Sequence, residues 1–115
     1  MKKYVVSAGL LTGLFLLTNC HSTKKLASVE PPKLTYESTM HATIISNCSP
    51  CHIAGKGNKK PYDNFANTSQ DIDEILRRIK SNPTDRGFMP FKHDKLSDST
   101  IAIFQKWKDD GLLEK

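Results

Sequence analysis

Cys48-Ser49-Pro50-Cys51-His52 is a single C-x-x-C-H motif within a chain of 115 residues. In an exported protein this spacing indicates covalent attachment of one c-type haem. We expect the two thiols, which share a tight helical turn, each to form a thioether with one of the two haem vinyl groups. His52 then lies beneath the macrocycle, where its imidazole ligates the iron. C-x-x-C alone is less specific, because redox dithiols and zinc sites also use it.

The first residues predict export. Met1-Lys2-Lys3 is a short positive segment, and the uncharged apolar stretch from Tyr4 to Leu17 follows it. This stretch is shorter than the roughly 20 residues that a membrane span needs, and it fits the apolar region of a signal peptide. We therefore expect the domain to face the periplasm, with the choice between inner and outer membrane left open.

Leu17-Thr18-Asn19-Cys20 resembles the lipobox of bacterial lipoproteins. The resemblance implies a signal peptide over residues 1–19 and a lipid on Cys20, which becomes the first residue of the mature protein. Residues 20–35 are polar, contain Pro31-Pro32 and are predicted to form a flexible linker that tethers the domain to a membrane. The alternative is a plain signal peptide or an uncleaved anchor.

The cysteine count agrees with both assignments. The chain has three cysteines, so lipid on Cys20 and haem on Cys48 and Cys51 leave none for a disulfide. The formal net charge of +5 is mild and the charges are mixed along the chain, which does not indicate binding to nucleic acid. The length suits one small domain, and a covalent haem would supply much of its core.

Three segments have helical periodicity, and no segment alternates as a strand would. Apolar residues recur at helical spacing from Tyr36 to Ile45, just before the motif. The second helix carries the stripe Ile72, Ile75, Leu76 and Ile79 and stops at Asn82-Pro83. The third helix is predicted to begin at Ser97 as N-cap and to end at Gly111. The segments predict an all-α domain. The apolar positions of the third helix are Ile101, Ile103, Phe104 and Trp107.

The order of these features resembles the small class I cytochrome c family over Tyr36 to Leu113. The loop Cys51-His52-Ile53-Ala54-Gly55-Lys56-Gly57, with Pro61 beyond it, is similar to the loop after the haem motif in bacterial members. Gly87-Phe88-Met89-Pro90, followed by Leu96-Ser97-Asp98, resembles the distal loop and the start of the last helix. The resemblance implies a single domain over residues 36–115 wrapped around one haem, with histidine and methionine as axial ligands.

His52 and Met89 are therefore the candidate iron ligands. Met89 lies in an irregular loop bounded by proline, where a thioether can cross to the far face of the haem, whereas Met40 lies on an apolar helical stripe. A histidine and methionine pair raises the reduction potential relative to two nitrogen ligands. His93 is a rival distal ligand by its place in the sequence. The other histidines, His21 and His41, are interpreted as solvated polar residues.

Several residues are candidates for supporting roles. The Pro61 carbonyl, by family resemblance, is the expected acceptor for the second nitrogen of His52. Trp107 and Tyr36 are expected to pack the terminal helices together, or to donate hydrogen bonds to a haem propionate. Gly55 and Gly57 are expected to serve the turn after the motif. A basic cluster either steers an acidic redox partner or is simply a solvated loop; it consists of Lys56, Lys59 and Lys60.

Three functions are compatible with these features. The first is a one-electron carrier that exchanges electrons with redox protein partners and is not an enzyme. The second is a haem enzyme or ligand sensor with an open distal iron site. Met89 and the presence of only one C-x-x-C-H motif argue against this function. The third is a haem-free zinc site or redox dithiol at Cys48, Cys51 and His52, for which the chain has no βαβ pattern and no obvious fourth ligand.

Overall fold

The computed structural model describes residues 30–115. The predicted signal peptide over residues 1–19, the lipidation site Cys20, His21 and most of the linker lie outside the described residues. Pro31 to Lys115 form one compact unit. No helix within residues 30–115 is long and apolar enough to cross a membrane.

The described chain is helical, as the sequence predicts. A π-helical turn, η1 (Tyr36–Met40), runs directly into α1 (His41–Cys48), and α2 (Phe65–Lys80) and α3 (Asp98–Asp109) follow. Residues 30–115 contain no strand, only an isolated parallel bridge between Thr35 and Leu113. The all-α fold class is therefore confirmed. We call residues 49–64, between α1 and α2, the motif loop, and residues 81–97, between α2 and α3, the methionine loop.

Local capping explains where the helices begin. Ser97 caps α3 as predicted, because its hydroxyl accepts a hydrogen bond from the Thr100 N–H (3.2 Å). Asn64 caps α2 in the same way through the Asn67 N–H (2.9 Å), so α2 begins seven residues before the apolar stripe does. Gly111 follows α3 with a φ of 101°, a left-handed conformation that favours glycine at a helix end.

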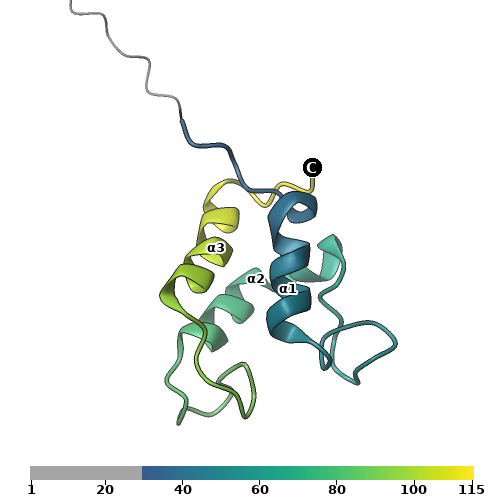
Figure 1. Ribbon diagram of the computed structural model, residues 1–115, viewed down its shortest axis with the longest axis vertical. Coiled ribbons are helices and arrows are strands. Elements are labelled where there is room, and N and C mark those ends of the chain that lie inside the picture. The colour runs from purple at the N-terminus through teal and green to yellow at the C-terminus, as the bar shows by residue number, and fades with distance from the viewer. Residues whose placement is uncertain (1–29) are drawn as a thin grey trace, which may run out of the picture. The chain divides into compact units, whose positions relative to one another are not determined.

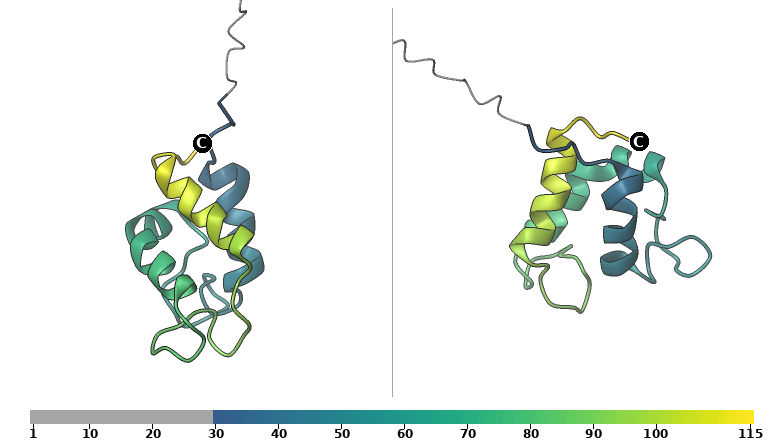
Figure 2. Two further views of the ribbon diagram at one scale, coloured as in Figure 1. Left: turned by 90° about the vertical axis from the view of Figure 1, so that its left-hand side faces the viewer. Right: turned by 45° about the horizontal axis from the view of Figure 1, so that its top comes forward.

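The three helices pack around one hydrophobic core (Figures 1 and 2). α3 contacts both α2 and η1. Each helical segment contributes most of the apolar stripe that its sequence predicts, with the exception of Ile45, which is 38% exposed, and Ile53 adds a residue from the motif loop. The buried core residues on the helices are Tyr36, Met40, Ile44, Ile72, Ile75, Leu76, Ile79, Ile101, Phe104 and Trp107.

The two ends of the domain are joined to each other. The Tyr36 N–H donates to the Leu113 carbonyl (2.8 Å), and the Glu37 N–H donates to the Glu114 carbonyl (3.0 Å). Trp107 is fully buried, and its indole N–H donates to the same Leu113 carbonyl (2.9 Å). In Figure 1 the joined ends lie at the top, while the end of α1 that carries Cys48 and the methionine loop lie at the opposite end.

Candidate functional site

The two motif cysteines differ in their surroundings. Cys48 is the last residue of α1 and packs half-buried against the hydrophobic core, whereas Cys51 is exposed. Both are free thiols. Burial raises the pKa of the Cys48 thiol to about 11, which favours its neutral form near pH 7.

Backbone hydrogen bonds close the motif loop on itself. The His52 N–H donates to the Cys48 carbonyl (3.0 Å), and the Lys59 N–H donates to the Cys51 carbonyl (3.2 Å). Gly57 passes so close to the carbonyls of Pro50 and Cys51 that a Cβ atom there would overlap them. Gly55 has a φ of 72°, a left-handed conformation. The prediction that these glycines serve the turn after the motif is confirmed.

The His52 imidazole is held through its Nδ1, but the acceptor differs from the predicted one. Nδ1 lies 2.8 Å from the Lys60 carbonyl oxygen, and the Pro61 carbonyl instead accepts from Asn67 Nδ2 (2.9 Å). The reason is the Tyr62 N–H, which donates to the His52 carbonyl (2.8 Å) and sets the register of the returning chain. Because a carbonyl only accepts, Nδ1 carries the proton and Nε2 keeps its lone pair.

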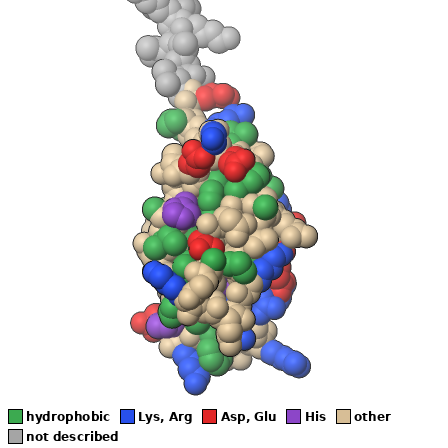
Figure 3. Space-filling model, turned by 90° about the vertical axis from the view of Figure 1, so that its right-hand side faces the viewer, with side chains coloured by type: hydrophobic (Ala, Val, Ile, Leu, Met, Phe, Trp, Pro, Cys, Tyr) green, Lys and Arg blue, Asp and Glu red, His purple; other side chains and the backbone are tan. Residues whose placement is uncertain are grey.

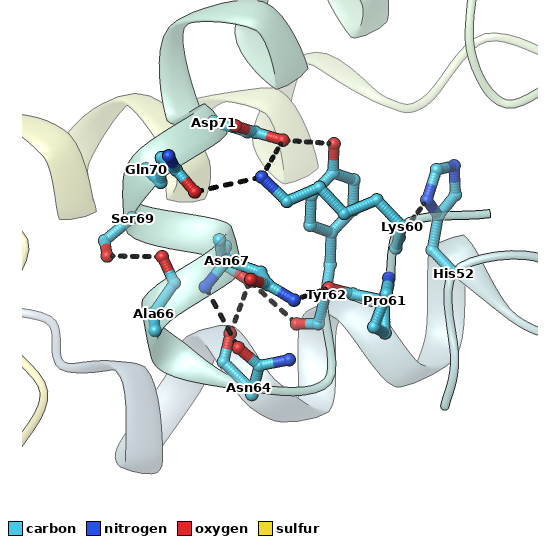
Figure 4. A network of polar contacts seen from close by, with 11 residues as sticks. His52, Lys60, Pro61, Tyr62, Asn64, Ala66, Asn67, Ser69, Gln70 and Asp71 are labelled. Atoms are coloured by element: carbon cyan, nitrogen blue, oxygen red, sulfur yellow. Dashed lines mark hydrogen bonds and ion pairs between the residues drawn. The ribbon is translucent and has the colours of Figure 1, made fainter. Parts of the chain in front are cut away.

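A polar network on α2 supports this imidazole (Figure 4). The Tyr62 ring stacks on the His52 ring, with centroids 4.7 Å apart and an angle of 14° between the planes. Its hydroxyl donates to Asp71 Oδ2 (3.0 Å), which also receives Lys60 Nζ at 2.9 Å. Burial and the hydrogen bond to Asp71 raise the pKa of Tyr62 to about 12, and the hydrogen bond from Lys60 lowers the pKa of Asp71.

Met89 lies on the other loop and faces the same core. Its side chain is half-buried and packs against the core cluster that Cys48 and Tyr62 also contact. Its N–H donates to the Arg78 carbonyl (3.3 Å), and the preceding Phe88 is buried. Beyond Met89 the loop is open to solvent, with the Phe91 side chain 66% exposed.

Tyr36 and Trp107 pack against each other in the core, with ring centroids 5.9 Å apart. The Tyr36 hydroxyl donates to the Tyr62 carbonyl (2.8 Å), and the Trp107 indole N–H is bonded to Leu113. Both side chains thus pack the terminal helices together, and both polar hydrogens have acceptors within the protein.

The remaining polar candidates lie on the surface. His41 and His93 are exposed, as expected for solvated residues, and so are Lys56 and Lys59. Lys60 is different, because its ammonium group is bonded to Asp71 and to Gln70 Oε1 (3.1 Å). Figure 3 shows the face on the α1 side, where basic side chains lie among polar and hydrophobic ones and several mark the lower end of the domain.

Sequence reasoning did not identify three supporting residues. Tyr62, Asp71 and Arg78 touch the candidate ligands or their loops, and none belongs to a motif. One signal was available: Asp71, Glu74 and Arg78 recur on the polar side of an amphipathic helix, at the spacing that brings side chains onto one face. The spacing of these residues along the helix does not show which loop residues they contact, such as Tyr62 and Gly87.

Other features of the described residues lie apart from the motif. A shallow cavity of about 520 Å³ is lined by α3 residues, Lys80 and Asp110. Residues 30–115 hold no group of three histidine, cysteine, aspartate or glutamate side chains arranged to bind a metal ion.

Comparison of the chain with family models, with curated proteins and with solved structures gives no match.

Proposed function

We propose that this protein is a monohaem c-type cytochrome that carries single electrons between redox proteins of the cell envelope. The observation that carries the proposal is the state of His52 within its C-x-x-C-H motif. With Nδ1 bonded to the Lys60 carbonyl, the imidazole offers Nε2 to a metal, and a second hydrogen bond of this kind is what orients metal-ligating histidines.

The donor set suits a haem c. Cys48 and Cys51 are free thiols available for thioether bonds, and His52 supplies a neutral imidazole. Met89 supplies a thioether from the methionine loop, packed against the same core as Cys48. When bound, the haem supplies one-electron redox chemistry, and the protein supplies ligands, burial and a docking surface.

The residues of the chain have distinct tasks in this proposal. Lys60 and Tyr62 fix the plane and the tautomer of the His52 ring, through a carbonyl acceptor and ring stacking. Met89 would supply the second axial ligand, and a histidine and methionine pair raises the reduction potential relative to two nitrogen ligands. The motif loop and the methionine loop would together hold the haem. Cys20 and the linker before Tyr36 would tether it to the membrane, which places its partners in the periplasm.

A haem stain after denaturing electrophoresis tests the covalent bond. The full-length protein made in a host with a cytochrome c maturation system should stain, and Cys48→Ser with Cys51→Ser should abolish the stain. Cys20→Ser is the matched control, because it removes the third cysteine and should keep the stain while releasing the protein from the membrane fraction. An unstained wild-type band would overturn the proposal and favour the zinc or dithiol alternative.

The optical spectrum tests the ligand pair. We expect a low-spin ferric spectrum with a near-infrared band from methionine to iron, which Met89→Ala should remove while opening the iron to exogenous imidazole. Since the Met89 side chain is only half-buried, the variant should keep its helical content. A high-spin five-coordinate ferric spectrum in the wild type would instead support the enzyme or sensor alternative.

A further inference from the structure

A single residue of α2 holds the methionine loop on both sides of Phe88. The backbone carbonyl of Arg78 accepts the Met89 N–H (3.3 Å), and its guanidinium Nη1 donates to the Gly87 carbonyl (3.2 Å). Phe88, between the two contacts, is buried. Residues 87–89 are therefore fixed to α2 through the main chain and the side chain of one arginine.

Arg78 is itself held in place. Its Nε lies 2.6 Å from Glu74 Oε1, one helical turn earlier on α2. Arg77 shares this carboxylate through two bonds of 2.7 Å, but within residues 30–115 its guanidinium donates hydrogen bonds to Glu74 alone. The two neighbouring arginines thus differ in one respect that matters here, which is the hydrogen bond to the loop.

Gly87 makes this contact possible. Its φ of 88° is a left-handed conformation, and a Cβ atom at this position would lie 3.2 Å from Arg78 Nη1. The glycine therefore allows the guanidinium to lie close against the loop backbone. After Pro90 the loop has few ties to the helices: residues 91–95 are exposed, Lys95 Nζ donates to the Lys80 carbonyl (3.1 Å), and Leu96 packs half-buried against the core.

We propose that Arg78 is a positioning residue that keeps the Met89 thioether on the distal side of the haem. This inference rests on the proposed function. A charge-assisted hydrogen bond that is present in the closed loop and absent in the open one shifts the equilibrium between them by about tenfold. Removal of the guanidinium should therefore increase the fraction of molecules in which Met89 has left the iron, without changing the ligands themselves.

The experiment compares Arg78→Met with Arg77→Met in the full-length, haem-loaded protein. The two substitutions remove the same charge from adjacent positions, and both break a bond to Glu74. Ferric Arg78→Met should bind imidazole about tenfold more tightly than wild type and show a weaker near-infrared band. Arg77→Met should match wild type in both measurements, and Arg78→Lys, which retains a cationic donor, should restore part of the band.

Equal imidazole affinity in Arg78→Met and Arg77→Met would overturn the inference while leaving the proposed function intact. A wild type without haem or without the near-infrared band would overturn the proposed function itself. If Arg78→Met fails to accumulate, the milder pair Arg78→Lys and Arg77→Lys decides. Arg78→Lys, which loses the guanidinium bond to the Gly87 carbonyl, should bind imidazole more tightly than Arg77→Lys, and equal affinities would contradict the inference.

Discussion

The motif loop and the methionine loop each carry one proposed iron ligand, but they are built differently. The motif loop is closed by hydrogen bonds within its own backbone, such as those from Lys59 to Cys51 and from Tyr62 to His52. The methionine loop has local turns too, but Arg78 on α2 holds its central part, and Phe91 beyond it is exposed. Several side chains also brace the motif loop from α2, as Asp71 does at Tyr62, whereas the hydrogen bonds from α2 to the centre of the methionine loop all come from Arg78.

This difference assigns different freedom to the two ligands. A loop closed by its own main chain changes shape only if several hydrogen bonds break together. The centre of the methionine loop is held by one residue of α2, so it can open when few hydrogen bonds break. Local opening in folded proteins occurs first in such weakly held segments. We therefore expect His52 to be fixed and Met89 to be the ligand that exchanges.

The largest effect should come from Gly57→Ala. The new Cβ would overlap the backbone carbonyls of Pro50 and Cys51, which cannot move aside without reshaping the motif loop. We expect the free energy of unfolding to fall by about 3 kcal/mol, as for severe overpacking. Gly87→Ala in the methionine loop should cost only about 1 kcal/mol, the strain of a left-handed alanine, because its nearest neighbour is the flexible end of Arg78.

Urea unfolding monitored by circular dichroism measures both variants. A Gly87→Ala variant as unstable as Gly57→Ala would show that the methionine loop is as rigid as the motif loop, and the contrast between them would be lost.

A smaller effect should appear in acid. The hydrogen bond from Arg77, with help from Arg78, lowers the pKa of Glu74 to about 2, below the value of about 4.3 of an unfolded chain. A carboxylate with a depressed folded pKa stabilises the fold above its unfolded pKa and loses that contribution as the pH falls through the folded value. Wild type should therefore lose stability between about pH 4.5 and 2.

Glu74→Gln removes this part of the acid sensitivity. The free energy of unfolding of the variant, measured by urea titration at several pH values, should change less over that range than in wild type. Asp71 and Asp110 also have lowered pKa values and titrate in both proteins, so only the difference between the two curves reports on Glu74. Parallel curves would mean that the Glu74 carboxylate is not paired with Arg77 and Arg78 in the folded protein.

The smallest effect should come from Phe91→Ala. Phe91 is 66% exposed, and the Lys92 ammonium group lies over its ring, 5.3 Å from the centroid. We expect the free energy of unfolding, measured by urea titration, to stay within about 0.5 kcal/mol of wild type, as for surface substitutions. A loss several times larger would mean that this part of the methionine loop is folded onto the domain and is not the open segment described above.

Short-range patterns in the sequence predicted most of the helical fold. Apolar periodicity located the buried faces of α2 and α3, and Ser97 and Gly111 marked the ends of α3 because caps depend on residues within one turn. The start of α2 was missed, because the polar residues Asn67, Ser69 and Gln70 interrupt the apolar periodicity between Phe65 and Ile72.

The candidate site was predictable only in part. The motif names its own residues, but the acceptor for His52 lies one residue before the predicted Pro61, in an irregular loop whose register depends on a backbone bond from Tyr62. The contact of Arg78 with Gly87 joins a helix to a loop of no regular geometry. No periodicity encodes such a contact, since it follows from how the helices pack.

The joined ends of the domain also determine how it would respond to mechanical force. Tension on the segment before Leu34 would fall first on the hydrogen bond from the Leu34 N–H to Asp110 Oδ2 (2.7 Å), and then on the two hydrogen bonds that η1 makes with Leu113 and Glu114. Trp107 reinforces this junction, because it is buried and its indole N–H donates to the same Leu113 carbonyl. The methionine loop and the end of α1 that carries Cys48 lie at the other end of the domain, off this load path (Figure 1). Tension on the N-terminal segment would thus act on the end of the domain where the termini meet, and the loops that carry the proposed ligands His52 and Met89 would keep their geometry.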